Sequence, residues 1–430
     1  MKSKTHIRLL VVSMLIVFLY PSIPGAETAD SEQPATSLNE LLEEAKRRNP
    51  EILAAREALE AARHHVSVAR GYPDPSFTYT YFPANIETRL GPQRYILQLV
   101  QPLPFPGKLS LKGNIAAYDA KIRGERLNGT ILNVLKSIKE TYVSLAAIDE
   151  AMAVLIQEKE IFDRFGEIVR TRLETGRGYQ QDLLKIRIER SKLEERALNY
   201  EKWRFSLTSS LNALLNRSTD SPISVDEIES VNEIQRSLDE LEDLALQRPE
   251  ILAAELHIRQ RHLAQSLARR QYWPDFTLGM SYINIGESPT DIPRSGEDAW
   301  NVSIGVRLPL WFGKVRGGVK EAASMIRYLE RDLDALKART RAEIHDLHNQ
   351  YRIALDLVTL YREDLIPRAE QSLQSAVAGY VTGDVDFLYL LDCERLLLEL
   401  RITLAERKAD VETKIAGIEA LVATELVQRR

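Results

Sequence analysis

The chain contains the segment Phe276-Thr277-Leu278-Gly279-Met280-Ser281-Tyr282, in which large apolar residues alternate with small or polar ones. Alternation with a period of two predicts a β-strand, because successive side chains of a strand point to opposite faces. One face of this strand is therefore apolar and the other is polar. Three further segments show the same alternation, least regularly in the second: 77–81, 95–100 and 300–308.

These four predicted strands form two pairs. The links within the pairs, 83–93 and 284–298, contain Pro, Gly and Asn and are predicted to be loops. A soluble sandwich would bury the apolar faces, but the sequence contains no other apolar layer for the strands to pack on. In a transmembrane barrel the polar face lines a wet lumen and the apolar face contacts lipid. Strands of about eight to ten residues are long enough to cross a bilayer when tilted.

Four strands are too few to close a barrel, since eight is about the smallest number. One chain must therefore contribute its strands to a shared wall. Two chains would supply eight strands around an interior filled by side chains, and three would supply twelve strands around a channel. A trimer is the better prediction for a conduit.

The sequence also repeats itself. The segment Asn49-Pro50-Glu51-Ile52-Leu53-Ala54-Ala55-Arg56 returns in the second half as Arg248-Pro249-Glu250-Ile251-Leu252-Ala253-Ala254-Glu255. Further landmarks match in the same order, including Tyr72-Pro73-Asp74 with Tyr272-Trp273-Pro274-Asp275. Matched landmarks at similar spacing indicate a tandem duplication, with a first repeat at 37–236 and a second at 237–430. The alternative is that Pro-Glu-Ile-Leu is merely a common way to start a helix.

Each repeat is predicted to contain a helix, a strand pair, a long helix and a returning helix. Pro50 and Pro249 interrupt the first helix of the two repeats, and Ser37 and Ser237 are suited to cap it. The long helices are predicted at 108–173 and 314–378, and the returning helices at 179–216 and 386–427. At about 1.5 Å per residue, the long helices would extend over roughly 100 Å.

Pro367 predicts a kink or a break in the second long helix. The helices carry many Glu, Lys and Arg side chains, which places them outside the bilayer. Paired helices from three chains could prolong the barrel as a tube. The alternative for the helices alone is a coiled-coil stalk.

Residues 1–26 are predicted to be a cleaved secretory signal peptide. Lys2, Lys4 and Arg8 precede an apolar run that is too short to span a bilayer comfortably. An uncleaved membrane anchor is the alternative. Residues 27–36 are polar and are predicted to be flexible.

The bulk composition narrows the class of protein further. The net charge is −5, and removal of the three signal-peptide cations makes it about −8 (−5 − 3), which argues against nucleic acid as a partner. Cys393 is the only cysteine. The sequence therefore offers no disulfide framework and no acylated cysteine near the signal.

Taken together, these features resemble the TolC family of outer-membrane efflux proteins. The tandem halves, the Pro-Glu-Ile-Leu starts, the glycine tips and the corner Gln101-Pro102-Leu103-Pro104-Phe105-Pro106-Gly107-Lys108 carry the resemblance over 38–421. The resemblance implies a mainly α fold with a β-barrel part, in which a homotrimer forms a twelve-stranded barrel in the outer membrane and a twelve-helix periplasmic tunnel. It implies a passive exit duct for substrates delivered by an inner-membrane pump and a periplasmic adaptor.

The corner at 101–108 most resembles the heavy-metal, CzcC-like branch of the family, which would make metal cations the cargo. Drug and peptide export stay open, because the pump is another chain. The alternative function is a periplasmic coiled-coil scaffold or adaptor without a pore. An adaptor would show one helical hairpin flanked by small β domains, whereas this sequence has two matched halves.

The resemblance also assigns an entrance gate just around the second glycine tip. The family places a Tyr before the glycine, a basic residue after it and inward-facing Asp side chains on the next helix. Val385 stands where the basic residue is expected, and Tyr389 stands where one Asp is expected. The candidate gate residues are Tyr380, Asp384, Asp386, Tyr389 and Asp392.

An acidic ring at such a constriction would favour cations. Asp384 and Asp386 could supply this charge in place of the missing Asp. The alternative for Asp386 is that it caps the returning helix. Gly176, Gly178 and Gly383 are predicted to mark the hairpin tips that contact the adaptor.

The sequence does not predict an enzyme, a cofactor site or a metal site. His345 and His348 are three residues apart on a predicted helix, but no third ligand lies near them in sequence, and metal sites usually need three or four. Ser, His and Asp occur without a nucleophile elbow.

Overall fold

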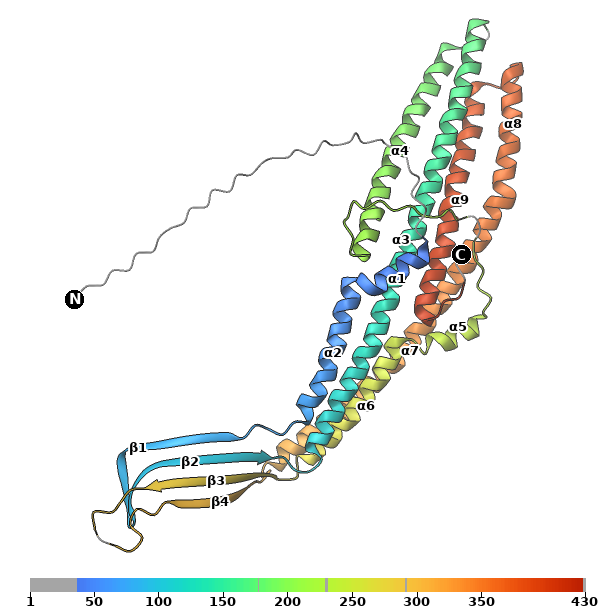
Figure 1. Ribbon diagram of the computed structural model, residues 1–430. Coiled ribbons are helices and arrows are strands. Elements are labelled where there is room, and N and C mark those ends of the chain that lie inside the picture. Colours follow the sequence, from blue (N-terminus) through green and yellow to red (C-terminus); the bar gives the residue numbers. More distant parts are fainter. Residues whose placement is uncertain (1–36, 177, 229–230, 291, 428–430) are drawn as a thin grey trace, which may run out of the picture. The chain divides into compact units, whose positions relative to one another are not determined.

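The computed structural model describes residues 37–176, 178–228, 231–290 and 292–427 (Figure 1). The expected signal peptide, 1–26, and the expected flexible segment, 27–36, lie outside the described residues. The described chain is mainly helical, with one four-stranded sheet at one end of the helices. Along these described ranges, no helix is both long and apolar enough to cross a membrane.

The two halves contain their elements in the same order, except that the second long helix is divided into α7, a π-helical turn and α8. In the first half these are α1 (Leu38–Arg48), α2 (Pro50–Arg70), β1 (Ser76–Thr88), β2 (Gly91–Leu103), α3 (Lys108–Glu174) and α4 (Gln180–Leu214). In the second half they are α5 (Leu238–Ala245), α6 (Pro249–Arg270), β3 (Asp275–Ile285), β4 (Ala299–Arg307), α7 (Phe312–Leu360), α8 (Ile366–Thr382) and α9 (Phe387–Val422). A π-helical turn, η1 (Tyr361–Leu365), joins α7 to α8.

The predicted break before Pro50 is built around Asn49, which is buried. The Asn49 side-chain oxygen accepts hydrogen bonds from the backbone N–H groups of Glu51 and Ile52, at 2.9 and 3.1 Å. Its amide nitrogen donates to the carbonyl of Leu214 at 2.8 Å. The residue therefore caps α2 and ties the start of that helix to the end of α4. Pro50 follows at the first helical position, where its missing N–H has no cost.

The predicted interruption near Pro367 is also confirmed. α7 passes into the π-helical turn η1, and α8 begins at Ile366 with Pro367 in its first turn. Proline lacks an N–H and its ring crowds the carbonyl four residues earlier, so a wider turn before it relieves the conflict. α3 contains no proline and runs unbroken for 67 residues.

The strands form one antiparallel sheet in the order β1-β2-β3-β4. The prediction of a loop at 83–93 is wrong, because β1 and β2 continue into this segment and are joined by a two-residue turn. A register shift between Tyr81 and Ile86 accommodates Pro83, which cannot donate to the ladder. The other link is a loop that follows Ile285, close to its predicted start.

The register places most of the large apolar residues of the four strands on one face, with exceptions such as Ile96 and Ile283 on the other. Phe77 pairs with Leu99, Leu99 with Met280, and Met280 with Val302, and directly paired residues share a face. The next row on that face contains Tyr79, Leu97, Tyr282 and Trp300, whereas a row on the opposite face contains Thr78, Gln98, Ser281 and Asn301. The predicted two-faced strands are therefore confirmed as one two-faced sheet.

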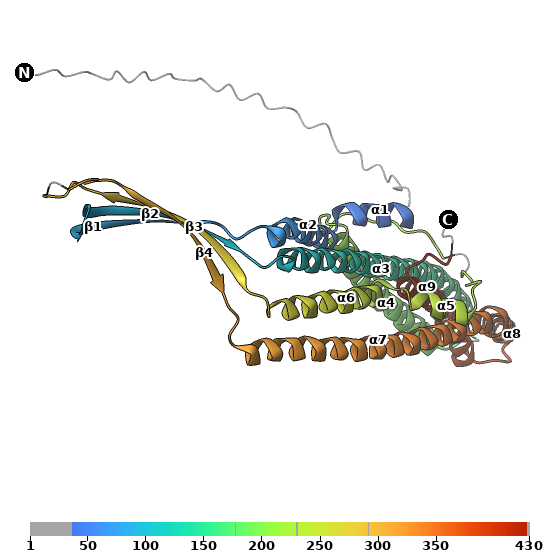
Figure 2. The ribbon, with the colours of Figure 1, turned by 90° about the horizontal axis from the view of Figure 1, so that it is seen from below.

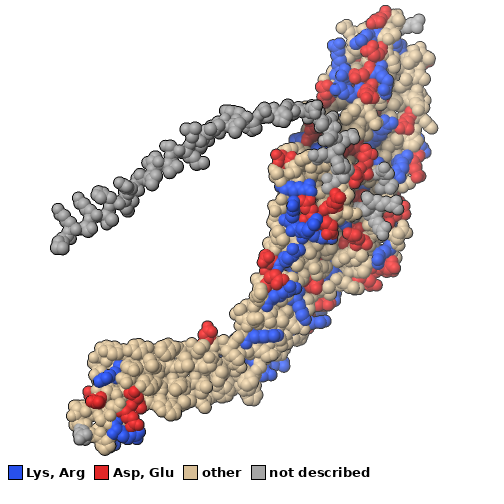
Figure 3. All heavy atoms as spheres, in the orientation of Figure 1, with Lys and Arg blue, Asp and Glu red and all other residues tan. Residues whose placement is uncertain are grey.

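The apolar face is open in the single chain. Trp300 is 69% exposed and Ile304 is 76% exposed. Figure 3 shows the sheet as almost free of charged side chains except at its far end. The side chains on this face therefore gain little apolar burial from their own chain.

α3 is the central helix of the described chain. Near the sheet it packs against α2 and α6, and α6 in turn packs against α7; further along, α3 packs against α4 and α9 (Figures 1 and 2). Buried apolar side chains form separate clusters along the helices. One of these, near the end away from the sheet, includes Phe162, Val169, Tyr380 and Leu391.

Candidate functional site

Two helical turns lie next to each other at the end of the helices away from the sheet (Figure 1). The first tip joins α3 to α4, and the second tip joins α8 to α9. Arg172 of α3 places its guanidinium 4.6 Å from the centre of the Tyr380 ring, and it also donates a hydrogen bond to the carbonyl of Tyr380. A cation–π contact and a hydrogen bond therefore tie the two tips together.

The three glycines predicted at the tips lie in these turns. Gly176 and Gly383 have φ values of +72° and +95°, a region that favours glycine. A Cβ atom at Gly176 would meet nothing within 4 Å, whereas one at Gly178 would lie 2.9 Å from the backbone nitrogen of Leu173. The contact of these tips with an adaptor stays a prediction.

The second tip is held by a residue that the sequence analysis did not single out. The carbonyl of Gly379 accepts the backbone N–H groups of Gly383, Asp384 and Val385, at 3.0, 2.9 and 3.2 Å. A Cβ atom at Gly379 would lie 2.6 Å from a methyl group of Val385. Glycine is therefore needed for the turn to fold back on the helix. The sequence did hold a signal for this position, because Gly379 is the first glycine after Gly318 and so ends a long glycine-free stretch.

Tyr380 is buried in the single chain, with 4% of its surface exposed. Its ring centre lies 5.6 Å from that of Phe387, and its hydroxyl has no hydrogen-bond partner among the described residues. Burial raises the pKa of this hydroxyl, the carboxylate of Asp182 raises it further, and Arg172 opposes both. Tyr380 thus joins α8 to α9 within one chain.

Asp386 occupies the N-cap position of α9. Its carboxylate accepts the backbone N–H of Tyr389 at 2.9 Å, so the helix-cap interpretation of this residue is confirmed. Asp384 accepts a hydrogen bond from the Thr382 hydroxyl at 2.7 Å and is exposed. Both carboxylates lie at the second tip, and only Asp386 is engaged by the backbone of the next helix.

Tyr389 and Asp392 lie on the first turns of α9 and are exposed. Asp392 forms an ion pair of 3.4 Å with Arg395, which also donates to Glu189 of α4 at 3.2 Å. Burial alone would raise the pKa of Glu189, but hydrogen bonds from Arg395 and Lys192 lower it overall. This network joins α9 to the first hairpin.

Arg172 and Arg395 supply cations near the acidic tip residues, although the basic residue expected at Val385 is absent. Sequence reasoning missed both. Arg395 is three residues after Asp392 on one helix, which was a usable signal. Arg172 lies 208 residues from Tyr380, and nothing in the local sequence links them.

A pair of buried carboxyl groups lies between α3 and α9. Glu158 is 2% exposed and Glu394 is 0% exposed. Burial raises the pKa of both groups, and the charge of Glu394 raises that of Glu158 further. The guanidinium groups of Arg164 and Arg401 act in the opposite direction on Glu394. Burial and proximity therefore favour the protonated form of the pair.

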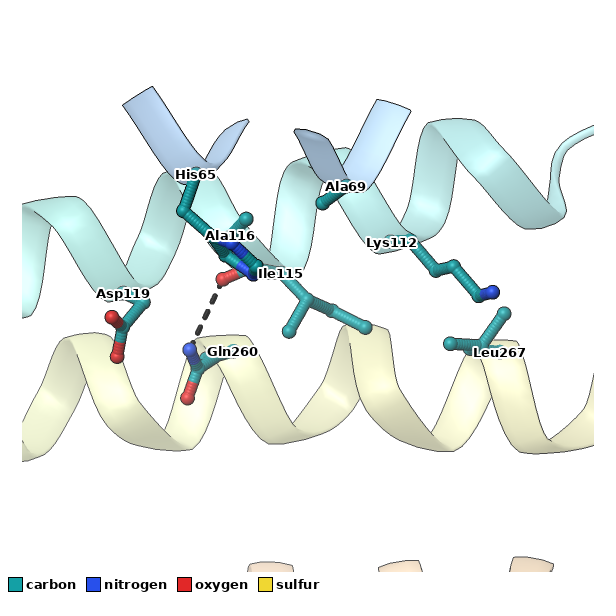
Figure 4. Close-up of a pocket in the computed structure, with 8 residues that line it drawn as sticks. All are labelled: His65, Ala69, Lys112, Ile115, Ala116, Asp119, Gln260 and Leu267. Carbon is teal, nitrogen blue, oxygen red and sulfur yellow. Dashed lines mark hydrogen bonds between the residues drawn. The ribbon is translucent and has the colours of Figure 1, made fainter. Parts of the chain in front are cut away.

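A cavity of about 460 Å³ lies near the sheet, between α2, α3 and α6 (Figure 4). His65, Lys112 and Asp119 contribute its charged or titratable groups, and Gln260 donates to the carbonyl of Ile115 at 3.0 Å. In the described part of the chain, no group of three or more His, Cys, Asp or Glu residues could hold a metal ion.

The profile of the family described as "Outer membrane efflux protein" matches residues 41–217 and 241–424, which make up most of the chain. The chain belongs to the outer membrane efflux protein family. The resemblance to TolC-like channels seen in the sequence is thereby confirmed. Membership of this efflux family makes the protein an outer-membrane channel and not an enzyme, and it argues against a scaffold without a pore.

Curated relatives of this outer membrane efflux protein include the cobalt-zinc-cadmium resistance protein CzcC of Cupriavidus metallidurans. The two are 22% identical over 412 residues, which cover 91% of this chain and 94% of CzcC. The probable outer membrane lipoprotein SilC of Salmonella typhimurium is 25% identical over 171 residues, 38% of this chain and 35% of SilC.

Solved structures of outer-membrane channels share the fold. The outer membrane protein VceC of Vibrio cholerae matches with a TM-score of 0.75 and 19% identity, over 91% of this chain and 97% of VceC. CusC matches with a TM-score of 0.77 and 16% identity, over 93% of this chain and 99% of CusC. The mainly helical architecture with a small antiparallel sheet is therefore that of a TolC-like channel.

Proposed function

We propose that three copies of this efflux protein form the exit duct of a tripartite exporter, with twelve strands closing a barrel in the outer membrane. The observation that carries the proposal is the open four-stranded sheet, whose apolar face is exposed and whose outer strands β1 and β4 have no further partner among the described strands. Unpaired backbone groups are costly in lipid, and four strands cannot close. Pairing of β4 with β1 of the next copy would give the backbone groups of both edge strands a partner. It would also close the sheets of the three copies into one barrel.

The helices next to the sheet support the same arrangement. α2 and α7 flank α3 and α6, so α7 of one copy would meet α2 of the next. Val68 of α2 is 72% exposed, and Tyr328 of α7, beyond the end of that helix next to the sheet, is 60% exposed. These surfaces leave room for a neighbouring helix, and the tunnel would continue from the barrel into the periplasm.

The order of elements in the two halves supports a further part of the proposal, that a unit at 37–236 was duplicated to give 237–430. Each repeat would contribute one strand pair to the barrel. We also propose that residues 1–26 direct the chain across the inner membrane and are then removed.

Thiol cross-linking tests the closed barrel. In a Cys393→Ser background, Thr78→Cys on β1 is combined with a cysteine at Asn301 or Ser303 on β4, and a short bifunctional thiol reagent is added to membranes. Covalent dimers and trimers are the expected products. In the matched control, Gln98→Cys on the central strand β2 replaces Thr78→Cys. This control should give no covalent dimers or trimers. Exclusive cross-linking within one chain would contradict the trimer.

The second tip is proposed as the periplasmic entrance, with an acidic lining supplied by Asp384 and Asp392. Neutralising both to Asn should lower the preference for cations, measured as the reversal potential in planar bilayers under a salt gradient. Tyr380 would act through packing, because it is buried. Tyr380→Phe is therefore expected to leave the conductance unchanged, and Tyr380→Ala to raise it; equal effects of the two variants would contradict this role.

Gly176, Gly178 and Gly383 are proposed to mark the surface that meets the periplasmic adaptor, with an inner-membrane pump behind it. Gly176→Trp or Gly383→Trp is expected to abolish export while trimers persist in the outer membrane. Adaptor capture by the trimer is the direct measurement. Unchanged export and unchanged capture would reject the assignment.

Divalent metal cations are the proposed cargo, because CzcC is named for cobalt, zinc and cadmium resistance and covers nearly the whole chain. Expression in a host lacking its own metal-efflux duct, together with an adaptor and a pump from the source organism, should raise the tolerated zinc and cadmium concentrations. A gain in tolerance to drugs alone would point to another cargo.

A further inference from the structure

The four helix segments that adjoin the sheet share an unusual charge pattern. They are 61–70 of α2, 108–118 of α3, 256–270 of α6 and 312–320 of α7, and together they contain eleven Lys and Arg residues and no Asp or Glu. We call these segments the basic belt. Asp119 and Glu321 are the first acidic residues beyond it on α3 and α7. Figure 3 shows blue side chains on the helices just beyond the part of the sheet that is almost free of charge.

Most cations of the basic belt are not neutralised within the described chain. Arg63 and Lys108 form ion pairs, with Glu60 and Asp275 respectively. Lys314, Arg316 and Lys320 are exposed and form no ion pair among the described residues. Closely spaced like charges repel one another, so the belt would gain from an anionic partner.

Aromatic side chains mark the boundary between the sheet and the basic belt. Phe105 stacks on Trp273 with ring centres 5.0 Å apart, and Tyr272 stacks on Phe312 at 6.3 Å. Trp311 is 79% exposed. Aromatic residues concentrate where a transmembrane protein crosses the membrane surface. The basic belt therefore lies at the level of the lipid headgroups on the helical side of the sheet.

A cavity of about 400 Å³ opens at this boundary, between the end of α6 and the start of α7. Trp311, Pro309 and Val315 form apolar walls, and Lys314 and Gln271 contribute polar groups. An apolar wall beside an exposed ammonium and an amide suits a molecule with a phosphate at one end and hydrocarbon at the other. Membrane-adjacent clusters of Lys and Arg attract anionic lipid in this way.

We propose that the basic belt binds anionic phospholipid headgroups of the periplasmic leaflet, with one lipid seated in the cavity between α6 and α7. Lys314 would contact the phosphate, and Trp311 would pack along the glycerol and the first methylenes. This binding would hold the channel at a fixed depth and angle in the membrane. The inference rests on the outer-membrane placement of the sheet and needs neither the identity of the cargo nor that of the pump.

Native mass spectrometry of the full-length, detergent-solubilised channel tests the proposal. The protein is titrated with dioleoyl phosphatidylglycerol and, separately, with dioleoyl phosphatidylcholine, which differ in net charge. The belt variant carries Lys314→Gln, Arg316→Gln and Lys320→Gln. The matched control carries Arg339→Gln, Arg352→Gln and Arg362→Gln, three exposed cations further along the same chain segment that form no ion pair among the described residues.

The unmodified channel is expected to retain phosphatidylglycerol over phosphatidylcholine by at least about fivefold, since each cation near an anionic surface contributes roughly that factor. The belt variant should lose this preference, and the control variant should keep it. Equal retention of the two lipids by the unmodified channel would overturn the proposal, as would an equal loss in both variants. Displacement of the lipid by inorganic phosphate alone would show a general anion site and would also overturn it. The oligomer mass in the same spectra reports separately on the proposed trimer.

Discussion

The sheet and the second hairpin tip differ in how far their apolar side chains are exposed to solvent in the single chain. Ile304 and Trp300 of the sheet are 76% and 69% exposed, whereas Leu390 and Phe387 near the tip are 1% and 3% exposed. Hydrophobic burial is the main favourable term in folding, so the tip obtains it inside one chain. The exposed face of the sheet can obtain it only from its surroundings. The buried side chains near the tip are therefore stabilised within one chain, whereas the apolar face of the sheet depends on lipid or on a neighbouring copy.

The largest effect is expected when a charged side chain is placed on the apolar face of the sheet. Ile304→Lys should destabilise the channel in lipid by roughly 2–4 kcal/mol, the cost of Lys near the middle of a bilayer. Asn301→Lys, on the polar face of the same strand, should cost much less. Urea unfolding in lipid vesicles measures both. Equal losses would break the distinction between the two faces.

A smaller effect is expected from the buried carboxyl pair that belongs to the helical end. The pKa values of Glu158 and Glu394 are raised in the folded protein. The pair's contribution to stability is therefore full below the ordinary Glu pKa and is lost as the pH rises toward the folded values. Glu394→Gln should make the channel more stable near pH 8 than the unmodified protein, because the variant has no buried carboxyl group there to ionise.

Thermal unfolding between about pH 5 and pH 8 measures this effect. The variant should show a smaller decline in stability across that range than the unmodified protein. Glu406→Gln, an exposed position on the same helix, is the matched control and should leave the decline unchanged. A decline that is identical in all three proteins would show that the pair does not titrate as proposed.

The smallest expected effect concerns the helix cap at the second tip. Asp386→Ala removes the acceptor for the Tyr389 N–H and should cost about 1 kcal/mol, whereas Asp386→Asn should retain most of the stability. Asp384→Ala removes only an exposed contact with Thr382 and should cost little. Chemical denaturation of the three variants ranks them. A larger loss for Asp384→Ala would mean that the first helical turn is held differently.

The fold could be predicted wherever a local pattern has one physical explanation. Alternation at 276–282 and proline at 50, 249 and 367 sufficed, because strand pleating and the missing N–H act on neighbouring residues. The loop predicted at 83–93 failed for a related reason. Its Pro, Gly and Asn residues are typical of loops, but an edge strand can absorb a proline through a register shift.

The tip was predictable only in part. Gly176 and Gly383 were located correctly because a left-handed turn needs glycine. The contacts of Arg172 with Tyr380 and of Glu158 with Glu394 join residues more than two hundred positions apart. Such pairs follow from how the two halves pack against each other, and one sequence contains no signal for them.

The π-helical turn at Tyr361–Leu365 takes up one residue more than an α turn would between α7 and α8. Each residue of a regular α-helix advances by about 100° around the axis, so an extra residue held in a regular helix would turn every later side chain to another face. The wider turn absorbs that residue instead. Deleting a single residue from it should therefore restore an ordinary α turn and leave Tyr380 beside Phe387.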